Sequence, residues 1–153
     1  MRKLSKLRGS TFTDSIFASG VGYIKGKRAV ALPSRHALNR WVKLTLPETG
    51  KSTIVQVLDV GPYLWWDDQF VLMGARPLVE TLNYYQIPFP KRGAYPWHKI
   101  SYSGKIPPSK ASIDLTPEVW QDLGVDKSID ELKSYSNNNL IVEWFVKNDG
   151  AIS

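Results

Sequence analysis

Two aspartates carry the chemistry that this 153-residue sequence offers most clearly. Asp59 ends an alternating, strand-like run and stands just before Gly61 and Pro62, two turn-forming residues. Asp114 stands two residues before Thr116, where a helix is expected to begin. A pair of carboxylates on rigid elements can donate and accept protons, as the cleavage of a glycosidic bond requires. The same pair can also line a groove that binds sugar chains without cutting them.

Each aspartate also has a purely structural explanation. Asp114 lies close enough to the expected helix start to accept backbone hydrogen bonds there. Asp59 can close an Asx-type turn before Gly61. Because Asp59 follows a strand directly and precedes aromatic residues, we expect its side chain to be exposed.

The segment between the two aspartates, residues 61–110, is rich in proline, glycine and aromatic residues. Loops of this length are usually functional or disordered, and the aromatic content argues against disorder. We therefore expect an ordered insertion that forms one wall of a groove. Candidate substrate-contacting side chains in it and before it are Tyr23, His36, Tyr63, Trp65, Trp66, Asp67, Asp68 and Arg76.

Several of these side chains have more than one interpretation. Adjacent residues on an extended chain face opposite ways, so at least one of Trp65 and Trp66 is expected to be exposed and able to stack on a sugar ring. Asp67 and Asp68 are better explained as solvated charges on a loop than as ligands of a metal ion. Arg76 suits a clamp on a substrate carboxylate and a structural ion pair equally well.

The composition narrows the class of site. The chain has no cysteine, which excludes disulfides and a cysteine nucleophile. Its two histidines, His36 and His98, are too far apart for a convincing metal cluster, so we expect no metal and no other cofactor.

The net charge of +6 is unevenly distributed. Residues 1–43 contain ten basic residues and one aspartate, a balance of +9, whereas the remainder carries ten basic and thirteen acidic residues, a balance of −3. Such asymmetry favours an anionic partner such as a cell-wall polymer, a membrane surface or nucleic acid. A solvated basic tail is the alternative explanation. No recognisable nucleic-acid-reading motif accompanies the charge, so we expect no specific nucleic-acid partner.

The sequence predicts a basic, flexible arm over residues 1–10 and a single domain over residues 11–150. No stretch is long and apolar enough to span a membrane, and the basic start lacks the apolar region of a signal peptide. We expect short strands at 18–23, 29–33 and 140–146, a hairpin over 40–58, and a helix over 116–124. This pattern predicts a small, mainly β barrel with one or two short helices and a long aromatic-rich loop insertion.

Taken in order, four segments resemble the double-psi β-barrel domain shared by RlpA-like proteins and expansins, especially its bacterial and phage branch. They are Gly20-Val21-Gly22-Tyr23, the strand ending in Asp59-Val60-Gly61-Pro62, Ile113-Asp114-Leu115-Thr116-Pro117, and Val142-Glu143-Trp144-Phe145-Val146. The resemblance covers roughly residues 17–147 and implies a barrel of six strands.

The resemblance also implies a function at the bacterial cell wall, in the periplasm or outside the cell. It implies cleavage of peptidoglycan glycan strands by lytic transglycosylase-like chemistry, with Asp59 as acid/base and Asp114 as the second carboxylate. We expect the protein to be a monomer. Phage lysis, or export that bypasses the general secretory route, would bring it to the wall. The position of the family's usual histidine holds Pro33, with His36 three residues on, and this departure favours the alternative of an expansin-like polysaccharide-binding module.

Overall fold

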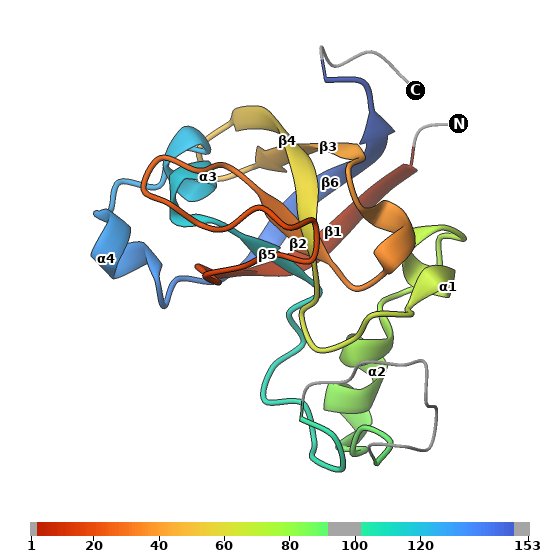
Figure 1. The fold of residues 1–153 in the computed structure, drawn as a ribbon. Helices are drawn as coiled ribbons and strands as arrows, with labels where there is room; N and C mark the ends of the chain where they lie inside the picture. The colour runs from red at the N-terminus through yellow and green to blue at the C-terminus, as the bar shows by residue number, and fades with distance from the viewer. Residues whose placement is uncertain (1–2, 92–101, 149–153) are drawn as a thin grey trace.

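The computed structural model describes residues 3–91 and 102–148. These residues form a mainly β fold around a closed barrel of six strands (Figure 1). The strands are β1 (Lys3–Thr11), β2 (Val30–Leu32), β3 (Trp41–Leu46), β4 (Lys51–Val60), β5 (Ile113–Leu115) and β6 (Asn137–Val146). Around the barrel they follow the order β1-β5-β2-β4-β3-β6. The pairs β1/β5 and β2/β4 are parallel, and the other four pairs are antiparallel. The predicted mainly β barrel is confirmed.

One apolar core fills the barrel. In β3 the side chains of Val42, Leu44 and Leu46 are fully buried and alternate with partly exposed ones, the pattern of a strand with one buried face. Trp120 is also fully buried, and its indole N–H donates to the Thr11 hydroxyl at 2.9 Å, so the largest core side chain has its polar atom satisfied.

The hairpin and the helix expected from the sequence are present. Strands β3 and β4 pair from Trp41 with Gln56 to Leu46 with Lys51. Helix α3 (Pro117–Asp122) begins with proline at its first position, as predicted. Thr116 precedes it, but its hydroxyl accepts from the backbone N–H of Ala29 at 3.1 Å and does not cap the helix.

Two predictions, one of a flexible arm and one of a strand, are wrong. Residues 3–10, predicted as a flexible arm, belong to β1, which pairs with both β5 and β6. The lysines and arginines of this stretch hide the alternation that places Leu7 and Gly9 in the buried interior. Residues 18–23, predicted as a strand, form turns and irregular backbone instead.

The described residues form four α-helices, more than the one or two expected. Besides α3 they are α1 (Asp68–Val71), α2 (Leu78–Tyr85) and α4 (Ile129–Leu132). Helices of four residues are too short for a hydrophobic period to reveal them. Figure 1 shows α2 beyond the end of the barrel, where it packs through a small apolar cluster of Leu64, Val79, Leu82 and Phe89.

The predicted insertion is thus ordered over much of its described length, and its residues Tyr95, Pro96 and Trp97 lie outside the described residues. None of the helices described over 3–91 and 102–148 is long and apolar enough to cross a bilayer.

Residues 12–29, which we call the cover loop, cross the outer face of the barrel beside β2 and β5 (Figure 1). Phe12 and Phe17 of this loop pack on Ala31 of β2 and Leu58 of β4. The backbone N–H of Ser19 donates to the carbonyl of Leu58 at 3.1 Å. The loop therefore forms a second, smaller apolar layer outside the barrel wall.

Candidate active site

Asp59 and Asp114 lie on the two strands that flank β2, and both pair with the same residue of that strand. Asp59 of β4 is in register with Ala31, and so is Asp114 of β5. Residues at one register position project to the same face of a sheet. Strands are about 4.8 Å apart, so the two aspartate Cα atoms are separated by roughly 10 Å along this face.

A β-bulge at Leu58 places Asp59 on this outer face. Val30 pairs with Val57, but the next residue, Ala31, pairs with Asp59, which leaves Leu58 as an extra residue in β4. Val57 belongs to the barrel core, whereas Leu58 belongs to the outer apolar layer. Strict alternation from Val57 would turn Asp59 into the core, and the bulge prevents this.

The two carboxylates open into one cavity of about 310 Å³. Asp14 of the cover loop is a third acidic residue on its wall. The aromatic side chains of Phe12, Tyr63 and Tyr102 complete this part of the lining, and no lysine or arginine lines the cavity among the described residues. The result is an acidic pocket with aromatic walls on a protein whose net charge is positive.

Asp59 is buried, with only 7% of its surface exposed. Its Oδ1 accepts hydrogen bonds from the backbone N–H groups of Ala18 at 2.8 Å and Val60 at 2.9 Å. Burial raises the pKa of Asp59 to about 6; the two backbone hydrogen bonds oppose this rise, and the proximity of the Asp14 carboxyl group, with its like charge, adds to it. The expectation of an exposed Asp59 is therefore wrong, and no Asx turn at Gly61 uses it, because the N–H of Gly61 donates to Leu32.

Asp114 is only partly buried and faces the cavity. Its carboxylate accepts a hydrogen bond from the hydroxyl of Ser10, its register partner on β1. Burial raises the pKa of Asp114 to about 7; the bond from Ser10 opposes the rise, and the charges of Asp14 and Asp59 add to it. Asp114 makes no capping hydrogen bond to α3, so the structural explanation offered by the sequence does not hold.

Tyr63 is the third predicted site residue that reaches the cavity. Its ring packs edge-on against Tyr102, with centroids 5.4 Å apart, and tilted against Phe89 at 5.7 Å. Its hydroxyl lies 3.4 Å from the Ser109 hydroxyl. Burial raises the pKa of Tyr63, so the phenol stays neutral and acts as a hydrogen-bonding group.

Another group of predicted site residues gathers at the end of β2, outside the lining of this cavity. The Nδ1 atom of His36 lies 3.1 Å from a carboxylate oxygen of Asp68, whose other oxygen accepts from Ser34. The ring of Trp66 packs edge-on against His36 at 5.6 Å, and the Arg35 guanidinium lies 5.4 Å above Trp66. These contacts fasten residues 65–68 to residues 33–36.

The remaining residues of the insertion also have partners inside the protein. Trp65 and Trp66 are both partly buried, so neither is the freely exposed ring that we expected. Asp67 is buried and accepts from the backbone N–H of Leu78 at 2.8 Å, which holds the start of α2. Arg76 forms an ion pair with Glu80 at 2.8 Å, the structural alternative of its two interpretations. Asp67 is therefore not a solvated loop charge, and Asp68, although partly exposed, is bound to Ser34 and His36.

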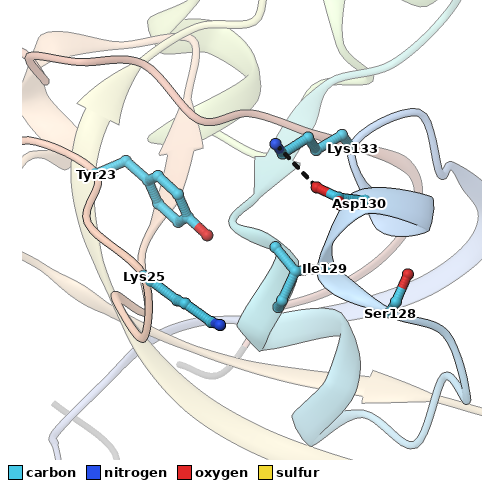
Figure 2. Close-up of a pocket in the computed structure, with 6 residues that line it drawn as sticks. All are labelled: Tyr23, Lys25, Ser128, Ile129, Asp130 and Lys133. Carbon is cyan, nitrogen blue, oxygen red and sulfur yellow. Dashed lines mark ion pairs between the residues drawn. The ribbon is translucent and has the colours of Figure 1, made fainter.

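Tyr23 lies at a different cavity, of about 410 Å³, between the cover loop and α4 (Figure 2). There Tyr23 and Lys25 face Ile129 and the ion pair of Lys133 with Asp130, 3.2 Å long. The Tyr23 hydroxyl donates to the buried carboxylate of Glu118, and burial with this bond raises the pKa of Tyr23 to about 12. Tyr23 thus fixes the cover loop and does not line the acidic cavity.

Sequence reasoning missed Asp14, Ser10 and Tyr102. Ser10 could have been found as a strand residue, had β1 been recognised. Asp14 and Tyr102 lie in irregular segments where no periodicity marks the direction of a side chain, and only the fold brings them to the cavity.

Carboxyl groups are the chemically reactive groups in the lining of the cavity. Within residues 3–91 and 102–148, no group of three or more histidine, aspartate or glutamate side chains is arranged to hold a metal ion. Two carboxyl groups with pKa values near 6 and 7 can exchange protons with a ligand at neutral pH. No protein-family model and no curated protein matches this chain.

Proposed function

We propose that this protein cleaves the glycan strands of peptidoglycan by lytic transglycosylase-like acid/base chemistry in the acidic cavity. The observation that carries the proposal is the common register of Asp59 and Asp114 with Ala31, which brings two carboxylates to one face and one cavity. Aromatic side chains beside them suit the apolar faces of sugar rings.

The proposal gives the role of general acid to Asp114. With a pKa of about 7 and a partly exposed side chain, Asp114 carries a proton in a large share of molecules at neutral pH. It donates this proton to the glycosidic oxygen as the bond from that oxygen to the anomeric carbon breaks. The sequence assigned the acid to Asp59, but Asp59 is more buried and is held by two backbone N–H groups.

Asp59 supplies the ionised carboxylate. With a pKa of about 6 it is mostly negative at pH 7 and stabilises the positive charge that develops on the sugar ring. The sugar's own 6-hydroxyl attacks the anomeric carbon, and its proton passes to the Asp59 carboxylate. The product is a 1,6-anhydro sugar, and exchange with solvent returns both carboxyl groups to their starting states.

The barrel supports this class of function. Its six strands, with parallel pairs β1/β5 and β2/β4, are compatible with the double-psi β-barrel of RlpA-like proteins and expansins. The net charge of +6 favours retention on an anionic wall.

A second candidate is an expansin-like module that binds polysaccharide without cutting it. The observation that favours it is the engagement of Asp59 Oδ1 by Ala18 and Val60, since a carboxylate that anchors a loop has fewer lone pairs for a substrate.

Incubation with purified peptidoglycan, followed by mass spectrometry of the soluble fraction, separates the two candidates. We expect the wild type to release anhydro-muropeptides and both Asp59→Asn and Asp114→Asn to lose at least about 100-fold in rate. Asp126→Asn, at an exposed aspartate away from the cavity, is the matched control and should retain full activity. If the protein sediments with the wall but releases no fragments, the result would contradict the enzyme and support the binding module.

A further inference from the structure

Asp14 is the acidic residue of the cavity that neither the sequence nor the proposed reaction uses. It belongs to the cover loop and lies on the wall shared by Asp59 and Asp114. Although Asp14 is exposed, its backbone is held, because its carbonyl accepts from the N–H of Tyr23 at 3.1 Å. Tyr23 in turn is fixed through its hydroxyl to Glu118.

Glu118 is the main anchor of this part of the loop. Only 4% of its surface is exposed, and its carboxylate also accepts from the backbone N–H of Gly26 at 2.7 Å. Arg28, at the end of the loop, forms a two-pronged ion pair with Asp122 of α3 at 2.5 and 3.0 Å. Asp14 is therefore held against the cavity by the loop's attachment to α3.

The Asp14 side chain lines the cavity together with Asp59 and Asp114, and its negative charge helps to raise the pKa of both. Asp59 and Asp114 share the cavity lining with the hydroxyl-bearing side chains of Ser10, Thr11, Tyr63 and Tyr102. The charge of Arg8 acts on Tyr63, and its guanidinium is bound to Asn138 and Ser136. Among the described lining residues, no cation offsets the three carboxylates.

We propose that Asp14 is a positioning residue of the cavity: its carboxylate lies on the same lining as Asp59 and Asp114, and its negative charge keeps a proton on Asp114. A carboxyl group close to other negative charges is harder to ionise, so the ionised forms of Asp14 and Asp59 favour the protonated form of Asp114. Asp14 of the cover loop thereby influences the protonation of Asp114 on β5 through its charge, without a hydrogen bond between the two side chains.

This coupling has a catalytic consequence, which rests on the proposed function. The general acid must be protonated to act, so activity falls on the basic side as Asp114 ionises. Removing the charge of Asp14 makes Asp114 ionise at lower pH. The basic limb of the pH profile of kcat/KM should then move to lower pH, while the rate on the acidic side of the limb is retained.

The direct test follows the side-chain carboxyl carbons of Asp59 and Asp114 by NMR from pH 4 to pH 9. In Asp14→Asn we expect both carboxyl groups to titrate at lower pH than in the wild type, by about half a pH unit or more. Asp14→Glu should restore values near those of the wild type, and Asp126→Asn should leave them unchanged. Asp14→Ser, a second neutral variant without an amide, should behave as Asp14→Asn.

Unchanged titration of Asp59 and Asp114 in both neutral variants would overturn the role of Asp14. So would a loss of glycan release that is the same at every pH, since that is the sign of a merely structural residue. The two proposals fail separately. If the titrations shift but the wild type releases no fragments, the coupling stands and the lytic function fails; if fragments are released but the titrations do not shift, the reverse holds.

Discussion

Burial raises the pKa of Asp114 to about 7, against an ordinary value near 4, and the charges of Asp14 and Asp59 add to this rise. The folded state thus holds the proton more tightly than the unfolded state. The stability that this group contributes is fully present below about pH 4 and is lost as the pH rises through about 7. Asp59, with a pKa of about 6, acts in the same direction.

This predicts that the free energy of unfolding of the wild type falls between pH 5 and pH 8. Asp114→Asn removes one of the two groups responsible, so its stability should fall less over this range. At pH 8 it should exceed that of the wild type by on the order of 1 kcal/mol. Urea denaturation of both proteins at four pH values measures this difference. Parallel curves for the two proteins would show that Asp114 titrates normally.

At the scale of single residues, the sequence singled out two aspartates that share a cavity and predicted little about their surroundings. The short motifs around Asp59 and Asp114 identified both residues, and the fold brings both to one cavity. The exposure of Asp59 was mispredicted because no pattern in the sequence shows that the cover loop packs on this face and donates the Ala18 N–H to Asp59. Asp14 could not be predicted from the sequence, because its position depends on contacts between segments that are distant in the sequence.

The cover loop is the element that completes the cavity, and a glycine allows it to pack closely. A Cβ atom at Gly22 would lie 2.1 Å from the backbone carbonyl oxygen of Ser15, much closer than such atoms approach. Only glycine fits there without a shift of backbone. The strand predicted over residues 18–23 is absent, and turns and irregular backbone stand in its place.

Gly22→Ala should therefore displace the loop around Ser15, next to Asp14. We expect a loss of roughly 1–3 kcal/mol in the free energy of unfolding, the usual cost of forcing an extra methyl group into a packed site. Faster amide hydrogen exchange should be confined to residues 13–26. Ile24→Ala, at a side chain that is 72% exposed in the same loop, is the control and should change neither quantity. Equal exchange in both variants would mean that the loop is not held by this contact.

Elements with a clear pattern were predicted, and several short ones were not. The hairpin of β3 and β4, with its alternating buried valines and leucines, was found to within a few residues. The three-residue strand β2 lies within the predicted run 29–33, whereas β5, of three residues, and α1 and α4, of four residues each, were not expected. Such elements are stabilised by their neighbours in the barrel and carry little signal of their own.

For the molecule as a whole, the uneven charge is the feature that bears on its partner. Most of the basic residues of 1–43 lie in β1, in the cover loop, and in or just before β3, so this excess belongs to the folded domain. Lys6 and Lys25 are exposed members of this group. Contacts of exposed charges weaken with added salt, because the screening length falls from about 8 Å at physiological ionic strength to about 3 Å at 1 M.

We expect binding to purified cell wall to weaken severalfold between 0.15 M and 1 M salt, as sedimentation assays would measure. The double variant Lys6→Gln/Lys25→Gln should bind more weakly than the wild type at low salt. Lys91→Gln/Lys105→Gln removes the same charge from exposed positions outside residues 1–43 and is the matched control. Equal weakening in both double variants would mean that net charge, and not its location, governs retention on the wall.

The central claim is that Asp59 and Asp114 act together in one cavity on a glycan strand. The most direct measurement is the mass of the fragments that the wild type and Asp114→Asn release from purified peptidoglycan at pH 6. The wild type should release fragments that end in 1,6-anhydro sugars, and Asp114→Asn should release almost none while remaining folded. Fragments with ordinary reducing ends, or release that is undiminished in Asp114→Asn, would contradict the claim.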